Sequence, residues 1–344
     1  MLWYAALWVL ALSACTRGGR DEAVGEEQRL YEQARTYLFP LPATDSLRDT
    51  AMERLGARLY EEKALSLDST VSCATCHPVA HYGVDGKPVS EGIMGRRGTR
   101  NAPTTFFSGY YLAQFWDGRA KDLEHQVTGP LTNPNEMGLP DTNRAVSRLR
   151  RSVSYRRHFL RVFGDSVVTY SRLANAIAAY ERSLVTETRL DAYLRGDLDA
   201  LGPDEKAGLR IMLDKGCIPC HSGTAMGGAL YQKFGIFDDY RRQLGHVVQD
   251  SGRMAVTGLE QDRDVYKVPS LRNIVHTAPY FHDGSVSRLE DAIRIMGRLQ
   301  VGMELSGKEV RLIRRFLEAA SVPSDSLSVD ENGRLLRDRG ALGG

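Results

Sequence analysis

The sequence predicts a mostly α-helical protein made of two similar halves. Apolar residues recur at helical spacing in several segments, whereas alternation of apolar and polar residues is not sustained anywhere. The pattern Cys-x-x-Cys-His occurs once in each half, as "CATCH" at residues 73–77 and as "CIPCH" at residues 217–221. A helical segment leads into each copy, so the chain has the form of a crude internal repeat.

The overall composition is that of an ordinary globular protein. The chain has 344 residues, of which 42% are hydrophobic and 26% are charged, and this length is sufficient for two domains. The formal net charge of +2 argues against a nucleic-acid partner and against a charged membrane surface. After residue 15, no segment is long and apolar enough to span a bilayer.

The N-terminal run "LWYAALWVLALSAC" ends at Cys15, which stands outside the two repeated motifs. The run has the character of an export signal, and its last four residues resemble the lipobox of bacterial lipoproteins. We therefore predict a lipoprotein signal at 1–15 and a lipid anchor on Cys15, which would hold the protein at a membrane without a spanning helix. An ordinary secretory signal and a buried N-terminal helix are the alternatives.

The first half begins after a polar segment at 16–45, which we interpret as a tether that includes a short helix around 26–38. An amphipathic helix within 49–66 leads into the first motif, and helices are predicted at 141–163 and 171–195. The region 78–140 is rich in Gly, Pro, Asn and Thr, which predicts long ordered loops. Loops of this length in a compact domain are usually functional. The helix at 171–195 places four apolar residues at helical spacing: Leu173, Ile177, Tyr180 and Leu184.

The second half begins with "GPDEKAGLRIMLDKGCIPCH", in which Pro203 suits the first turn of a helix. A further helix is predicted at 307–320, because Ser306 can cap it and Glu309 follows three residues later. These signals divide the chain into an N-terminal domain at 46–195, a C-terminal domain at 196–320 and an extension at 321–344.

The position of a histidine directly after each cysteine pair indicates covalently bound haem. A redox dithiol calls for a βαβ context, and a zinc site calls for four soft ligands in one place without that histidine. In Cys-x-x-Cys-His the thiols form thioethers with the haem vinyl groups, and the histidine ligates the iron. We predict two c-type haems, with His77 and His221 as proximal ligands and with attachment at Cys73, Cys76, Cys217 and Cys220.

The ligand on the far face of each iron decides what the haem does. A methionine gives a saturated, high-potential haem for electron transfer, whereas an open position lets the iron bind small molecules. The residues alone leave the choice open, because any single methionine is more often core filler than a ligand. The candidates that follow the second motif are Met226, His246, Met254, His276, His282, Met296 and Met303.

Three long segments resemble bacterial di-haem cytochrome c peroxidases, a family that also includes the MauG-type enzymes, which oxidise residues of a partner protein. They are "RGTRNAPT" at 97–104, "QFWDGRAKDLEHQVTGPLTNPNEMG" at 114–138 and "YKVPSLRNIVHTAPYFHDGSVSRLEDAIRIMG" at 266–297. The resemblance covers roughly residues 50–320. It implies two cytochrome c-like domains with one haem each, the peroxidatic haem in the N-terminal domain and the electron-transfer haem in the C-terminal domain.

The resemblance also implies roles for individual residues. Trp116 matches the tryptophan that conducts electrons between the haems, Gln126 the distal-pocket glutamine and Glu136 the catalytic glutamate. Met296 stands where these peroxidases place the axial methionine of the second haem and where MauG has tyrosine. Taken without the resemblance, Trp116 would be assigned to packing and Glu136 to a solvated loop.

Two further implications concern calcium and the first haem. Asn101, Thr277 and Pro279 match the family's Ca²⁺ site between the domains, although "RNAPT" taken alone is also a plausible tight turn. Many members cap the resting first haem with a distal histidine, but this chain has Ile93 or Met94 at the matching place. We therefore expect no histidine switch and a first haem that is five-coordinate or binds water, with Met94 as a weak cap as the alternative. His81 we assign to a structural or surface role.

The function implied by the resemblance is an exported peroxidase that reduces hydrogen peroxide to water. Its donor would be a small cytochrome c or a cupredoxin, with electrons entering at the C-terminal haem and passing through Trp116 to the N-terminal haem. One alternative is a MauG-like enzyme that oxidises a protein or an organic substrate, and another is a di-haem electron carrier without catalysis. The expected location is the periplasm, with lipid anchoring at Cys15, and family members are often homodimers.

Overall fold

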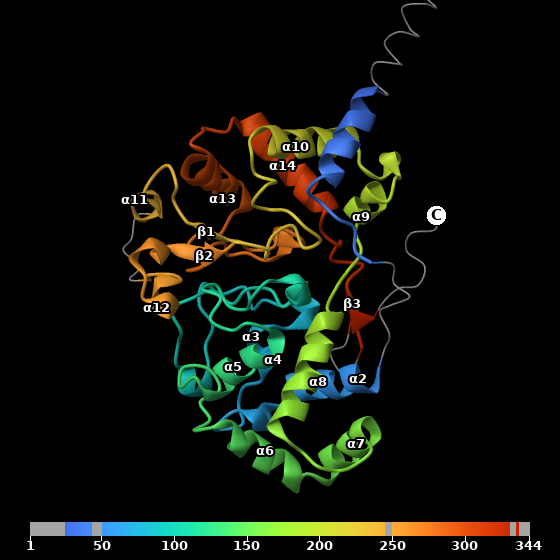
Figure 1. Ribbon diagram of the computed structural model, residues 1–344, viewed down its shortest axis with the longest axis vertical. Coiled ribbons are helices and arrows are strands. Elements are labelled where there is room, and N and C mark those ends of the chain that lie inside the picture. The colour runs from blue at the N-terminus through green and yellow to red at the C-terminus, as the bar shows by residue number, and fades with distance from the viewer. Residues whose placement is uncertain (1–24, 43–49, 245–249, 331–334, 337–344) are drawn as a thin grey trace, which may run out of the picture.

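The computed structural model of the protein describes residues 25–42, 50–244, 250–330 and 335–336. The signal at 1–15 with Cys15, the candidate ligand His246 and most of the extension beyond 330 lie outside the described residues. Two helical halves lie one above the other along the long axis (Figure 1). Each half has its own buried apolar core, one formed mainly by residues 41–185 and the other by residues 190–320 together with residues 30–38. No helix within the described ranges is both long and apolar enough to cross a bilayer.

The N-terminal half is helical with long loops. Thr50 and Glu53 form a capping box at the start of α2. Ser152 ends α6 and caps α7, so the helix predicted at 141–163 is two helices. The helices of this half are α2 (Ala51–Tyr60), α3 (Cys73–Cys76), α4 (Leu123–Gln126), α5 (Thr128–Thr132), α6 (Thr142–Arg151), α7 (Val153–Phe163) and α8 (Tyr170–Ser183).

The C-terminal half has the same character, with two short strands added. Pro203 lies in the first turn of α10, and Ser306 and Glu309 form the capping box that the sequence predicts for α14. Strands β1 (Tyr231–Lys233) and β2 (Val265–Lys267) pair antiparallel, as do β3 (Ser328–Val329) and β4 (Leu335–Leu336). The helices are α9 (Arg189–Leu194), α10 (Pro203–Asp214), α11 (Tyr240–Leu244), α12 (Met254–Thr257), α13 (Leu289–Met296) and α14 (Gly307–Ala319).

A repeated helix crossing accounts for the internal repeat in the sequence. In the first half α2 packs against α8, and in the second half α10 packs against α14. Each crossing is made at a glycine, because a Cβ atom on Gly56 would lie 1.9 Å from the Ala176 carbonyl oxygen and one on Gly208 would lie 2.0 Å from that of Leu312. The first helix of each pair precedes a Cys-x-x-Cys-His motif. The two halves therefore present their motifs from the same kind of helical support.

The two halves are joined by charged and aromatic contacts that are largely buried. Arg100 donates to Asp117 Oδ2 at 2.6 Å and, from two nitrogens, to both carboxylate oxygens of Asp250 at 2.6 and 2.8 Å. The rings of Tyr82 and His276 stack across the halves, with centroids 4.0 Å apart. These contacts fix how the two motifs lie relative to each other.

The described part of the expected tether packs on the C-terminal half. Residues 25–35 form a helix, drawn in blue beside α10 in Figure 1. Its residues Leu30 and Ala34, and Leu38 just beyond it, are buried in the second core. Lys206 Nζ also lies 2.5 Å from Glu27 Oε1. From residue 25 to 42 the chain is therefore part of the folded domain, and the segment free to act as a spacer is shorter than 16–45.

Candidate functional site

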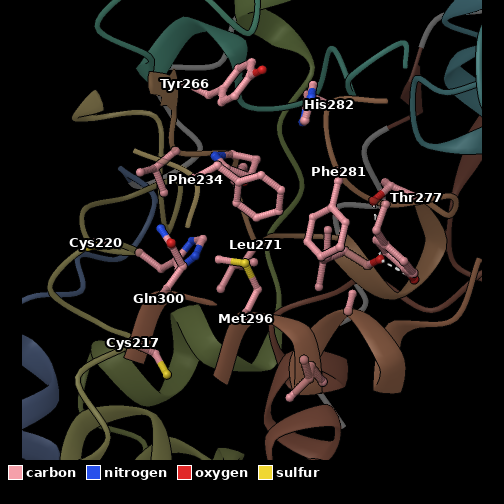
Figure 2. Close-up of a pocket in the computed structure, with 18 of the residues that line it drawn as sticks. Cys217, Cys220, Phe234, Tyr266, Leu271, Thr277, Phe281, His282, Met296 and Gln300 are labelled. Carbon is pink, nitrogen blue, oxygen red and sulfur yellow. Dashed lines mark hydrogen bonds between the residues drawn. The ribbon is translucent and has the colours of Figure 1, made fainter. Parts of the chain in front are cut away.

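The motif of the C-terminal half lines a cavity of about 240 Å³, which we call the C-terminal cavity. Cys217, Cys220 and His221 lie on its wall, and most of the remaining wall is apolar. Met296, the last residue of α13, extends its sulfur into the same space (Figure 2). The cavity therefore combines a potential haem attachment site, an imidazole and a thioether.

His221 has the properties of a neutral metal ligand. Its side chain is buried, and burial lowers the pKa of its imidazole to about 4, so the ring is neutral at pH 7. Neutral imidazole is the form that binds iron. Backbone groups of Met226 and Pro269 lie close to the ring and oppose this shift of its pKa only in part.

The structure reduces the candidates for a second ligand in this cavity. Met226 is fully buried in the second core, Met303 is exposed, and neither lies on the wall, nor does Met254. His276 is stacked on Tyr82 instead. Among the described candidates, the cavity wall retains His282 and Met296. Figure 2 shows His282 beside Tyr266, well away from Met296, and the ring centroids of His282 and Trp116 are 6.4 Å apart.

The motif of the N-terminal half lines a second cavity of about 190 Å³, the N-terminal cavity. Cys73, Cys76 and His77 lie on its wall. Gln126, the last residue of α4, and Glu136, in the loop after α5, lie on the same wall. The structure thus brings together the three groups that the sequence assigns to the peroxidatic site.

His77 is oriented by a backbone contact. Its Nδ1 atom lies 3.0 Å from the carbonyl oxygen of Gly83, which leaves Nε2 as the atom available to a metal. Gly83 has φ +72°, and a Cβ atom there would lie 2.6 Å from Thr105 Oγ1, so this turn requires glycine. Burial lowers the pKa of His77 below its usual value, which favours the neutral ring.

Glu136 is a largely buried carboxyl group whose position is supported from two sides. Burial raises its pKa above the usual value, and Arg119 and Asn133 oppose this shift. Its Oε1 atom accepts a hydrogen bond of 2.6 Å from Asn133 Nδ2, and its backbone carbonyl accepts one of 2.9 Å from the Ile93 N–H. The raised pKa makes this carboxylate a stronger proton acceptor than a solvated glutamate.

The segment that matches the position of the family's distal histidine lies away from the cavity. Ile93 is buried behind the Glu136 loop, Met94 is 66% exposed, and neither lines the N-terminal cavity. Among the described residues on that wall, His77 is the single histidine. His81 is exposed, as a surface assignment requires.

Trp116 lies at the boundary between the two cavities and lines both. Its Nε1–H donates to the Asn101 carbonyl oxygen at 3.0 Å, and its own carbonyl accepts from the Lys267 N–H at 2.8 Å. Asn101 and Lys267 also line both cavities, so this boundary is a hydrogen-bonded wall contributed by both halves.

The three residues assigned to calcium come together at the C-terminal cavity. Asn101, Thr277 and Pro279 all line it, and Asn101 Nδ2 donates to the Lys87 carbonyl oxygen at 3.0 Å. In the described parts of the chain, no group of three or more His, Cys, Asp or Glu residues is arranged to hold a metal ion. A cation here would therefore depend on neutral oxygen atoms.

Comparison with known proteins identifies the family. A family model described as di-haem cytochrome c peroxidase matches residues 50–199. Cytochrome c551 peroxidase of Nitrosomonas europaea is 44% identical over 78% of this chain and 79% of that protein. Cytochrome c551 peroxidase of Pseudomonas aeruginosa is 38% identical over 87% of this chain and 88% of that protein. The chain belongs to the bacterial di-haem cytochrome c peroxidase family.

Related di-haem enzymes of other function are also similar to this peroxidase. MauG of Paracoccus denitrificans is 33% identical over 71% of this chain and 74% of that protein. A crystal structure of a MauG-like protein associated with microbial copper homeostasis superposes with a TM-score of 0.72 at 28% identity, covering 82% of this chain and 93% of that chain. The predicted family and the enzymatic class are thereby confirmed, as is the mostly helical fold.

Membership of the family implies two c-type haems, and the residues of this di-haem peroxidase fit them. Each cavity carries two cysteines and a histidine whose lowered pKa favours the neutral ring, in the attachment pattern. The four described cysteines, Cys73, Cys76, Cys217 and Cys220, form no disulfide with one another.

Two polar residues on these walls were missed by sequence reasoning. Glu181 on α8 lines the N-terminal cavity with a buried Oε2 atom that has no partner, and Lys267 on β2 lines both cavities. Each interrupts an apolar segment, "ANAIAAYE" in one case and "VYKVPSL" in the other. A charged residue within such a segment is the signal that would have identified them.

Proposed function

We propose that this protein is an exported peroxidase that reduces hydrogen peroxide to water, using electrons from a small cytochrome c or a cupredoxin. The observation that carries the proposal is the contrast between the two walls. The N-terminal cavity has Glu136 and Gln126 beside its histidine, whereas the C-terminal cavity has the thioether of Met296. One site then suits a reaction that moves protons, and the other suits electron storage.

In this proposal Glu136 handles the proton that O–O cleavage requires. Its carboxylate takes a proton from one peroxide oxygen and returns it to the leaving oxygen, which is general acid–base catalysis. Asn133, bonded to Oε1 at 2.6 Å, holds the carboxylate in place, and the Gln126 amide orients the peroxide. The complete reaction consumes two electrons and two protons and yields two molecules of water.

When bound, the haems supply electron storage and the iron that reacts with peroxide. The chain supplies the connection between them. Trp116 lies on both walls, and its hydrogen bonds to Asn101 and Lys267 restrict its movement. We assign it to the electron route from the C-terminal to the N-terminal haem, with His77, His221 and Met296 as the protein's iron ligands.

Three features complete the proposal. Asn101, Thr277 and Pro279 would hold Ca²⁺ near the boundary through neutral oxygens. Cys15 would carry the lipid that holds the enzyme at a membrane facing the periplasm. The mature enzyme would act as a homodimer or as a monomer, which sedimentation of the detergent-solubilised protein distinguishes.

The decisive experiment measures peroxide-dependent oxidation of reduced cytochrome c by the haem-loaded protein and by its Glu136→Gln variant. We expect the variant to lose about 10²–10⁴-fold in turnover with its haem absorbance intact, because the acid–base group is lost. The matched control is Glu124→Gln. Glu124 lies on α4 near Gln126, pairs with Arg182 and does not line the cavity. Full turnover in the Glu136 variant, or none in the unmodified protein, refutes the proposal.

A MauG-like oxidation is the second candidate, because MauG itself is 33% identical to this chain. Met296 argues against it, since the resemblance places a tyrosine there in MauG. The two candidates differ in the reductant they accept. Sustained turnover with reduced cytochrome c supports the peroxidase, whereas peroxide-dependent oxidation of a protein or organic substrate without such turnover supports the MauG-like reaction. Two six-coordinate haems that ignore peroxide would instead identify an electron carrier.

A further inference from the structure

Lys267 is a buried cation that has no anionic partner in the part of the chain that the structure describes. Its side chain is 6% exposed, and Nζ lies 4.1 Å from the centroid of the Tyr111 ring. Within residues 25–42, 50–244 and 250–330, no carboxylate is in ion-pair contact with Nζ. The other strongly buried cations differ, since Arg272 pairs with Asp191 and Arg100 with Asp117 and Asp250.

Such an arrangement is costly unless an anion completes it. Buried charges in proteins are normally paired or bound to a ligand, because removing a charge from water costs several kcal/mol. Burial lowers the pKa of Lys267 to about 8, so the ammonium form still predominates at pH 7. The missing anion is therefore expected in the space next to Nζ.

That space belongs to both cavities. Lys267 lines the N-terminal and the C-terminal cavity, as does Trp116. The backbone holds it there, because its N–H donates to the Trp116 carbonyl at 2.8 Å and its partner in the β1–β2 ladder is Tyr231. The lysine thus stands at a fixed place on the wall that separates the two haem sites.

We propose that the Lys267 ammonium binds haem propionate at the boundary of the two cavities and raises the reduction potentials of both haems. The inference rests on the haems that family membership implies, and it does not require peroxide turnover. Each haem carries two propionate carboxylates, which are anions delivered with the cofactor itself. A cation between the haems favours their reduced states, because reduction adds negative charge near it.

The experiment is a spectroelectrochemical titration of the haem-loaded protein at pH 7, comparing Lys267→Met with Lys267→Arg. In the Lys267→Met variant we expect the equilibrium constant for reduction of each haem to fall by about tenfold. This corresponds to a reduction potential about 59 mV lower for a one-electron site. The arginine variant, which keeps the charge, should stay close to the unmodified protein. If Lys267→Met does not fold, Lys267→Gln keeps a polar side chain and carries the same expectation.

The matched control is Lys233→Met, on the paired strand β1. Lys233 is exposed and lines neither cavity, so its loss should leave both potentials unchanged. Unchanged potentials in Lys267→Met overturn the proposal, and so do equal shifts in the methionine and arginine variants. A shift in the potential of only one haem overturns the claim that Lys267 acts on both haems. If a free anion were the partner, the potentials of the unmodified protein would change between chloride and sulfate buffers, which also contradicts a propionate.

Discussion

The two cavities carry the same attachment motif but differ in what shares the wall with it. In the C-terminal cavity, Met296 at the end of α13 extends a thioether into mostly apolar surroundings. In the N-terminal cavity, two loop-associated residues, Gln126 and Glu136, contribute an amide and a carboxyl group. The repeat therefore supplies two equivalent frames, and residues outside the motif decide what each site can do.

The same contrast appears in the buried carboxyl groups of the two halves. Asp191 is fully buried against Arg272, and although burial opposes it, this pairing lowers the pKa of the carboxyl below its usual value. Glu181 lines the N-terminal cavity, and burial raises its pKa to about 8. One carboxylate is thus a charged structural anchor, whereas the other is held neutral next to a haem site.

The largest effect should come from breaking the anchor, by Arg272→Met. This change leaves the Asp191 carboxylate buried without its cationic partner. We expect a loss of about 3–5 kcal/mol in the free energy of unfolding, measured by guanidinium denaturation of the haem-loaded protein.

The control for this change is Arg314→Met, which removes an arginine from a pair with Glu290 on the surface of the same half. Exposed pairs contribute about 0–1 kcal/mol, so this variant should remain close to the unmodified protein. Equal losses in the free energy of unfolding would show that the buried Asp191–Arg272 pair contributes no more to stability than a pair at the surface.

Glu181→Gln should have an effect that depends on pH. The folded state keeps the Glu181 proton up to about pH 8, whereas the unfolded chain releases it near its ordinary pKa of 4.5. Because the folded state then binds more protons, this residue lowers stability as pH rises through that interval. For one proton the slope is at most about 1.4 kcal/mol per pH unit.

The measurement is the free energy of unfolding of both proteins between pH 5 and pH 8. As pH rises, we expect the Glu181→Gln variant to become more stable relative to the unmodified protein. Glu124→Gln serves as the control, because pairing with Arg182 lowers the pKa of Glu124 and so gives no loss of this sign. Parallel curves for the Glu181 variant and the unmodified protein would show that Glu181 is ionised in the folded state.

The sequence was informative where a local rule decides the structure. Pro203 and the Ser306–Glu309 capping box start their helices as predicted, since capping depends on neighbouring residues alone. It was less informative where distant contacts decide. The packing of residues 25–35 on the second core and the short β1–β2 pair depend on tertiary contacts. The break at Ser152 is different, because it follows from a local cap that sequence reasoning missed: the Ser152 side chain accepts from the Tyr155 N–H.

The candidate site shows the same division. The Cys-x-x-Cys-His motifs predict haem attachment from the sequence, because the ligand and both attachment points lie within five consecutive positions. By contrast, the residues alone did not separate Met296 from Met226 and Met303. The family resemblance selected Met296, and of the three it is the one that lines the cavity. Lys267 stands out because no anionic partner faces it among the described residues, and that feature appears only in the structure.

Met296→Leu tests whether the two sites are independent. Methionine ligation raises the potential of a c-type haem, so its loss should lower the reduction equilibrium of the C-terminal haem by at least about tenfold, or about 59 mV. The potential of the N-terminal haem should remain unchanged, because Met296 lines only the C-terminal cavity. Met303→Leu, at an exposed site off the wall, is the control.

This pattern differs from the one expected for Lys267, whose removal should move both potentials. A Met296 variant that also lowers the potential of the N-terminal haem would mean that the boundary wall transmits changes between the sites. If neither potential changed, the thioether would not be a ligand, and His282, the other described candidate on that wall, would become the residue to replace. Measured together, the two variants distinguish two effects on the haem potentials. Lys267→Met tests a charge that acts on both haems, and Met296→Leu tests a ligand that acts on one.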